Sequence, residues 1–309
     1  MEYRNKIEDI MLEGKSAITL GKFDGVHAGH QKLIHKVTEK KKEGFQSVLF
    51  TFDKPVGAFL REFDIAVLLT KEERKKILGQ YSLDYVIECE FTKEFAHMEA
   101  EAFIEEILVK RLKVGYIAVG PDCTFGYQAK GSYRMLQQFG KEYGFEVEVV
   151  DKLTYEGSEI SSTRIRKSIE AGKIEEARDM LGYPYPVIGE VVHGKKLGRT
   201  LGMPTTNLVP PEEKLLPPYG VYATQIVIDG KCYKGVTNIG SKPTVSEELL
   251  RGVETYIFDY EDDLYGKIIE IDLLWYERPE LKFDSVETLK EKMEQDILIV
   301  RKYFIDNPL

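Results

Sequence analysis

Short apolar runs alternate with amphipathic stretches over residues 16–150, and this alternation stops near residue 178. The first run, Ser16–Leu20, predicts a buried strand because it is short, mostly apolar and followed at once by glycine. Further strands are predicted over 47–52, 85–89, 116–119 and 146–150, and helices over 31–43, 71–81, 100–111 and 132–143. Strands that alternate with helices predict a mostly parallel sheet covered by helices on both faces, so the fold class of this part is α/β.

A different pattern begins after the stretch LGYPYPVIG, residues 181–189. Its prolines end the last helical pattern, so a boundary is predicted near Tyr185, with one domain over 1–185 and a second over 186–309. Strand patterns over 221–228 and 232–239 flank Asp229-Gly230, a pair typical of a tight hairpin. Segments 253–260 and 267–276 predict another pair of neighbouring strands.

The sequence closes with a helical pattern. Asp284 is predicted as its N-cap, with Glu287 three places on completing a capping box. The apolar residues predicted to line one face are Leu289, Met293, Ile297, Val300 and Phe304. Strands followed by one helix predict a small antiparallel β-barrel with a C-terminal helix.

Composition limits the classes of function. The chain has 309 residues, and its 43 basic and 52 acidic side chains give a net charge of −9, which argues against nucleic acid or an anionic membrane as the main partner. Three scattered cysteines, Cys89, Cys123 and Cys232, form no CxxC pair, so no disulfide framework or thiolate zinc site is predicted. With no signal-like start and no run of about 18 apolar residues, we expect a soluble cytoplasmic protein.

The segment GKFDGVHAGH, residues 21–30, follows the first predicted strand and opens a predicted helix. Ligands of open α/β sheets bind beyond the carboxyl ends of the strands, where such a turn presents backbone N–H groups. Its glycines allow close approach of a ligand, and His27 and His30 lie three apart, so both can reach a phosphate chain. A helix N-terminus disfavours imidazolium, whereas a bound triphosphate would favour it there. The alternative, a glycine turn with two solvated histidines, is preferred for such a motif in isolation.

Two further segments favour a phosphate site. Residues 160–166, ISSTRIR, place three hydroxyls and two guanidinium groups at the start of another helical stretch. Gly120-Pro121-Asp122 adds a polar loop after the predicted strand 116–119. Taken alone, ISSTRIR is more often a capped helix with exposed arginines.

Together, GKFDGVHAGH, GPDCTFGYQAKG (120–131) and ISSTRIRKSIEAGKIEEARDMLG (160–182) resemble the Rossmann-like nucleotidyltransferase domain of the prokaryotic bifunctional riboflavin kinase/FAD synthetases. The resemblance implies transfer of AMP from ATP to FMN with release of pyrophosphate. It also implies roles for these residues: His27 and His30 act at the ATP phosphates, Asp122 contacts the flavin or nucleotide side, and the nucleotide and phosphate site includes Gly21, Asp24, Gly25, Gly29, Ser162, Thr163 and Arg166.

Two departures from the family pattern keep a second interpretation open. TFDKPVGAF, residues 51–59, has no histidine where the family usually has a PHP-like element, and Cys123 stands where the family usually has phenylalanine. Each is either a tolerated variation or a sign of a weakened adenylyl-transfer site. The second interpretation is therefore a riboflavin kinase with a degenerate N-terminal domain.

The second predicted domain has its own glycine-rich segment. GEVVHGKK, residues 189–196, nearly matches a P-loop, but Lys196 takes the hydroxyl position and no helical pattern follows, so a P-loop domain is not predicted. In GKKLGRTLGMPTTNL, residues 194–208, Thr205 and Asn207 offer oxygen ligands suited to Mg²⁺. A plain glycine-rich barrel loop is the alternative for the glycines alone.

GRTLGMPTTN also resembles the riboflavin kinase domain of the same family, as do GVYA (220–223), NIGSKPT (238–244), VETYIFDYEDDLYGK (253–267) and ERPELKFDSVETLKEKMEQD (277–296). The resemblance implies that Glu254 is the general base for the ribityl hydroxyl of riboflavin. It places Thr205 and Asn207 at Mg²⁺, Gly194 and Gly198 at the nucleotide, and Arg278 at the flavin. An exposed strand carboxylate is the alternative for Glu254, and a surface arginine for Arg278.

These resemblances cover nearly the whole chain. They predict an enzyme that uses ATP and Mg²⁺ to convert riboflavin to FMN in the C-terminal barrel and FMN to FAD in the N-terminal domain. Its partners would be these small molecules, without nucleic acid or membrane, and the chain would be a monomer or weak homo-oligomer. A flavin-binding regulator without turnover is a further alternative, disfavoured because the implied catalytic glutamate and metal ligands are all present.

Overall fold

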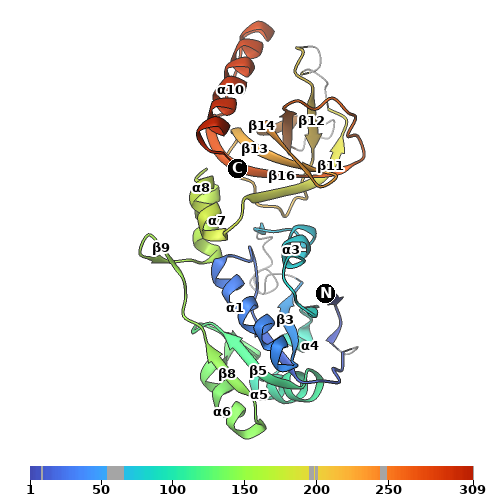
Figure 1. Cartoon of the computed structure of the whole chain (residues 1–309), viewed down its shortest axis with the longest axis vertical. Helices are drawn as coiled ribbons and strands as arrows, with labels where there is room; N and C mark the ends of the chain where they lie inside the picture. Colours follow the sequence, from blue (N-terminus) through green and yellow to red (C-terminus); the bar gives the residue numbers. More distant parts are fainter. Residues whose placement is uncertain (8–9, 54–65, 195–197, 199–200, 244–248, 309) are drawn as a thin grey trace. The chain divides into compact units, whose positions relative to one another are not determined.

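The computed structural model describes residues 1–7, 10–53, 66–194, 198, 201–243 and 249–308 (Figure 1). The chain forms two compact units. The first unit comprises residues 1–65 and 74–162, and the second comprises residues 66–73 and 163–309. The segment 66–73 therefore belongs with the C-terminal part of the chain although it lies early in the sequence. The functional boundary near Tyr185 stays a prediction.

A six-stranded parallel sheet organises the first unit, in the order β1-β4-β3-β2-β5-β8. Its strands are β1 Glu2–Arg4, β2 Ser16–Leu20, β3 Gln46–Phe52, β4 Tyr85–Cys89, β5 Val114–Val119 and β8 Glu146–Val149. Every residue of β2 is buried, as a central parallel strand requires. The predicted parallel α/β sheet is confirmed.

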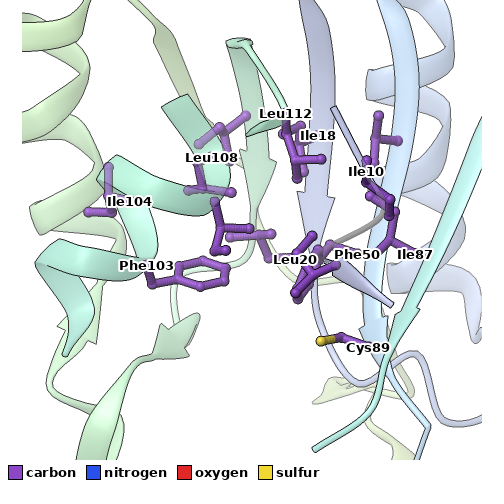
Figure 2. Packing of buried hydrophobic residues seen from close by; sticks show 14 of the residues in the cluster. Ile10, Ile18, Leu20, Phe50, Ile87, Cys89, Phe103, Ile104, Leu108 and Leu112 are labelled. Carbon is purple, nitrogen blue, oxygen red and sulfur yellow. The ribbon is translucent and has the colours of Figure 1, made fainter. Parts of the chain in front are cut away.

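The helical segments of this part of the chain are α1 Ala28–Glu39, η2 Lys40–Glu43, α3 Lys71–Leu78, α4 Lys93–Ala96, α5 Ala100–Ala102, the π-helix Phe103–Arg111, η4 Tyr127–Ala129 and α6 Tyr133–Tyr143. The four predicted helices are present close to their predicted positions, and two short helical segments, α4 and η4, were not predicted. On one face of the sheet, Ile18, Leu20 and Phe50 pack in one core with Phe103 and Leu108 of the helical segment (Figure 2). Two short ribbons complete the unit, β6 Thr124–Phe125 with β7 Gly131–Ser132, and β9 Thr154–Tyr155 with β10 Ser158–Glu159.

Strand order creates a switch point beside β2. The chain leaves β2 through α1 toward β3 on one side, and later returns to β5 on the other side. In open α/β sheets the crevice at the carboxyl ends of two such strands is the usual ligand site. Here the segments that follow β2 and β5 are 21–27 and 120–122, which carry the first set of predicted site residues.

The second unit contains a closed antiparallel barrel in the order β11-β12-β15-β14-β13-β16, with β16 pairing back to β11. Its strands are β11 Tyr185–Val192, β12 Thr205–Leu208, β13 Gly220–Ile228, β14 Lys231–Pro243, β15 Leu249–Ile257 and β16 Ile268–Pro279. The Asp229-Gly230 hairpin is confirmed, with φ of 49° and 78° at its two turn residues. The predicted barrel with a C-terminal helix is confirmed as well.

Three helices accompany the barrel strands in the sequence: α7 Ser162–Glu170, α8 Ile174–Leu181 and α10 Val286–Asp306. Helix α8 contacts β16 and β11, and α10 lies along β13 and β14 (Figure 1). Val300 and Phe304 of α10 pack with Ala223, Phe258 and Leu274 in one buried cluster. The predicted apolar face of the last helix therefore covers part of the outer surface of the barrel.

Two sequence expectations are wrong in detail. Segments 253–260 and 267–276 do not pair with each other: β15 pairs with β12 and β14, whereas β16 pairs with β11 and β13 and so closes the barrel. The N-cap of α10 is Ser285 rather than Asp284. Ser285 has extended backbone, its hydroxyl accepts from the Thr288 N–H, and the Thr288 hydroxyl accepts from the Ser285 N–H, so threonine replaces glutamate in the capping box.

Candidate active sites

The turn after β2 is held in an unusual backbone conformation. Phe23, Gly25 and Val26 have φ of 46°, 83° and 33°. Positive φ is rare for a β-branched residue such as Val26, and backbone of this kind clusters at functional sites. The amide of Gly21 donates to the carbonyl of Phe50, which joins the start of the turn to the end of β3. The predicted strand, glycine turn and helix are therefore all present.

His27 and His30 lie together at the start of α1. His27 is the N-cap, and its Nδ1 accepts from the backbone N–H of His30 at 3.4 Å. The two rings stack with centroids 3.7 Å apart, and the ring of Phe23 lies 4.8 Å from that of His30. A Cβ at Gly29 would lie 3.2 Å from the His27 ring, so glycine leaves room for this arrangement. The predicted placement of both imidazoles on one side is confirmed.

Burial sets the charge of this pair. It lowers the pKa of His27 to about 4, although the nearby carboxylate of Asp122 opposes the shift. Burial lowers the pKa of His30 well below its usual value, and the neighbouring His27 lowers it further. Both rings are therefore neutral at pH 7 in this structure. Because Nδ1 of His27 accepts a hydrogen bond, its proton is on Nε2, which can donate to a ligand.

Other predicted residues lie in the turn itself and in the segments that follow the neighbouring strands. The hydroxyl of Ser162 donates to the carbonyl of Asp24 at 2.6 Å, so it ties the turn to the end of the first unit. Asp122, after β5, forms an ion pair of 3.0 Å with Lys152, which follows β8. Lys152 also pairs with Glu159 at 2.8 Å. Sequence reasoning missed Lys152, whose only signal was its place shortly after a predicted strand.

Thr163 and Arg166 belong to the second unit, where the Arg166 guanidinium donates to the carbonyl of Ala66. Their assignment to phosphate stays a prediction. Cys123 packs partly buried against the core of the first unit, and burial raises the pKa of its thiol to about 12. It is therefore a neutral apolar filler. The altered element TFDKPVGAF lies, from residue 54 onward, outside the described residues.

A ladder of threonines shows which way the barrel strands face. The hydroxyls of Thr224, Thr237 and Thr255 are fully buried and bond in series, at 2.8 Å for each pair. Successive residues of a strand point to opposite faces, so Glu254 points away from this interior. It is half-buried on the outer face and directly opposite Asn207 of β12. The predicted base and one predicted metal ligand therefore share a face.

The two predicted nucleotide-loop glycines lie against the two predicted metal ligands. A Cβ at Gly198 would lie 3.2 Å from Oγ1 of Thr205, and a Cβ at Gly194 would clash with the side-chain amide of Asn207. Residues this close admit only hydrogen in place of a side chain. Asn207 is buried and Thr205 half-buried. Beside these two glycines, Thr205 and Asn207 offer side-chain oxygens, which is the donor chemistry that Mg²⁺ prefers.

Arg278 is engaged with the C-terminal helix. Its Nε lies 3.1 Å from each carboxylate oxygen of Asp296, a buried residue of α10 that also pairs with Lys292 at 2.7 Å. Val221, the register partner of Arg278, is also the partner of Asn238. The predicted flavin contact of Arg278 stays a prediction, and this structure adds that Arg278 anchors α10 to β16.

Comparison with known proteins identifies the family of both parts of the chain. The family model for FAD synthetase matches residues 10–164, and that for riboflavin kinase matches residues 181–304. The fold and these two matches define a protein that combines an FAD synthetase part with a riboflavin kinase part. The chain belongs to the bifunctional riboflavin kinase/FMN adenylyltransferase family.

Among the members, the protein of Listeria monocytogenes is 35% identical over 93% of this chain and 92% of its own length, and that of Escherichia coli K12 is 36% identical over 93% and 92%. A crystal structure described as the macrolide-efflux protein from Streptococcus pneumoniae shares the fold, with a TM-score of 0.88, 32% identity and coverage of 97% and 98%. Among the helices of the described residues, none has both the length and the apolar character needed to cross a membrane.

Proposed function

We propose that this chain phosphorylates riboflavin to FMN in its C-terminal domain and adenylylates FMN to FAD in its N-terminal domain, with ATP as donor in both reactions. The placement of Glu254 beside Asn207 on one face of the barrel is the observation that carries the first activity. The stacked histidines beside the switch point support the second. Family membership over nearly the whole chain supports the combination.

In the kinase reaction, Glu254 accepts the proton of the terminal ribityl hydroxyl as that oxygen attacks the γ-phosphorus of ATP. The bond from the γ-phosphorus to the β,γ-bridging oxygen breaks, and ADP leaves. Thr205 and Asn207 would hold Mg²⁺, which, when bound, neutralises charge on the transferred phosphoryl group. The hydroxyl oxygen of Thr205 and the amide oxygen of Asn207 fit this ion, which prefers oxygen ligands.

In the adenylyl transfer, an oxygen of the FMN phosphate attacks the α-phosphorus of ATP, and the bond to the leaving pyrophosphate breaks. The attacking group is already an anion, so no carboxylate base is needed. A neutral His27 donates its Nε2 hydrogen to a phosphate oxygen, and the site stabilises negative charge by hydrogen bonding. The packing of Cys123 against the core of the first unit supports an intact fold at its position.

We further propose that the enzyme works in the cytoplasm on small molecules, without nucleic acid, as a monomer or weak homo-oligomer. Its net charge of −9 supports this view of its partners.

Chromatography of products from purified chain, ATP and Mg²⁺ tests the proposal, with riboflavin or FMN as acceptor in separate reactions. FMN followed by FAD from riboflavin is expected. FMN without FAD from either acceptor would show a kinase with a degenerate N-terminal domain. Binding of flavin without any product would show a regulator and contradict both activities.

A further inference from the structure

A row of three polar residues crosses the barrel strands β12, β15 and β14. Asn207, Glu254 and Asn238 are direct register partners, since Glu254 is opposite Asn207 on one side and opposite Asn238 on the other. Side chains that are directly opposed in antiparallel strands project from the same face, with Cβ atoms about 5 Å apart. The amide of Asn238 therefore lies next to the carboxylate proposed as the base.

The row lies on the outer face of the barrel, just beyond the part that α10 covers. Two residues along from Glu254 and Asn238, Tyr256 and Val236 pack against the cluster that contains Phe304. The face is thus apolar under the helix and becomes polar at the row. Asn238 is half-buried, and among the described residues its side chain has no hydrogen-bond partner.

The carboxylate of Glu280 also lies near Asn238, beside Gly240. A Cβ at Gly240, on the same face two residues after Asn238, would lie 3.3 Å from Nδ2 of Asn238 and 2.6 Å from Oε1 of Glu280. Gly240 thus leaves room for both groups. Asn238 has Glu254 beside it on the neighbouring strand and Glu280 over Gly240. Carboxylates accept hydrogen bonds, whereas the amide both donates and accepts, and this set matches a chain of hydroxyl groups.

We propose that Asn238 binds hydroxyl groups of the ribityl chain and so positions the reacting hydroxyl at Glu254. This inference rests on the proposed kinase activity and adds a residue that determines acceptor specificity. A site built to bond a substrate hydroxyl discriminates against an acceptor that lacks it, because the protein group is then left unpaired.

The first experiment compares wild type and Asn238→Ala on riboflavin and on analogues that each lack one non-reacting ribityl hydroxyl. We expect Asn238→Ala to lower kcat/KM for riboflavin about 10-fold, the effect of one lost hydrogen bond, while the KM for ATP stays the same. The wild type should discriminate against at least one analogue, and the variant should lose that discrimination, as in a double-mutant cycle.

Asn238→Asp gives a second, independent readout, since it keeps the shape of the side chain but replaces the donating amide by a carboxylate that only accepts. Its discrimination among the same analogues should fall below that of wild type, which a merely structural role would not predict. Asn307→Ala is the matched control, since that amide bonds the Tyr303 carbonyl at the end of α10 and is exposed. It should leave acceptor discrimination unchanged.

If wild type makes FMN and Asn238→Ala discriminates among the analogues as wild type does, the inference is overturned while the proposed function stands. If Asn238→Ala does not fold, Asn238→Asp decides, and analogue discrimination equal to that of wild type overturns the inference. A wild-type chain that makes no FMN from riboflavin would overturn the proposed function and this inference with it.

Discussion

The carboxylate of Glu73 and the ammonium group of Lys214 form a fully buried ion pair, with Oε2 and Nζ 2.6 Å apart. Each partner has further hydrogen bonds. Glu73 accepts from the backbone N–H groups of Thr70 and Ile188, and Lys214 donates to the carbonyl of Leu68. Segment 66–73 is thereby fixed to the barrel, because a buried charge requires a partner.

Glu73→Ala should therefore lower the free energy of unfolding by about 3–5 kcal/mol, because Lys214 is left buried without its counter-charge. Lys214→Met should cost less, since Glu73 keeps two backbone donors. Urea denaturation measures both. The exposed pair Lys290 and Glu294 is the control, and Glu294→Ala should change stability by less than about 0.5 kcal/mol. Equal effects of Glu73→Ala and Glu294→Ala would contradict the role given to burial.

Stability should fall as the pH drops from 7 to 4. Burial lowers the pKa of His27 from 6.5 to about 4, so in this range the unfolded chain binds more protons than the folded one. The stabilisation lost through this group is about 2–3 kcal/mol. Denaturation at a series of pH values should show a smaller slope for His27→Gln. His35→Gln, at an exposed histidine of the same helix, is the control for substitution in α1.

Glu254→Gln should lower riboflavin phosphorylation by about 10²–10⁴-fold, because the amide cannot take the proton of the acceptor hydroxyl. Conversion of supplied FMN to FAD should continue at the wild-type rate. Parallel assays of the two reactions measure this. Loss of both activities in a folded variant would show that the two reactions do not have separate sites.

His30→Ala should slow FAD formation by about 10²-fold, because it removes one of the stacked imidazoles at the phosphate site. FMN formation from riboflavin should be unchanged. The same two assays test this prediction, with His35→Ala as the control on α1. An equal fall in FMN formation would contradict the assignment of this site to adenylyl transfer.

Gly194→Ala should raise the Mg²⁺ concentration needed for half-maximal kinase activity, because the added methyl group displaces the amide of Asn207. A metal titration at fixed ATP measures this shift. Gly14→Ala is the control, since a Cβ there would have its nearest neighbour at 3.8 Å. An unchanged metal requirement would remove Asn207 from the proposed Mg²⁺ site.

Much of the first unit was predictable because its signals are local. Buried strands such as Ser16–Leu20 are read from short apolar runs, and the histidine turn from its glycines. Its strand order and the neutral state of His27 and His30 were not predictable, since burial depends on residues brought together from distant segments. Whether His27 and His30 become imidazolium is therefore to be tested with ATP bound.

In the barrel, the sequence was enough to predict most strands and to show which residue types are available for chemistry. The alternation of apolar and polar residues and the hairpin turns are encoded within a few neighbouring positions. Tertiary structure decided which strands are neighbours: β15 lies between β12 and β14, so Glu254 faces both Asn207 and Asn238. It also decided that Glu73 belongs with Lys214, far along the chain. The alternation of side chains along a strand shows which residues share a face of that strand. Which strand lies beside it is decided when the barrel closes, and which charged residues pair is decided by their burial.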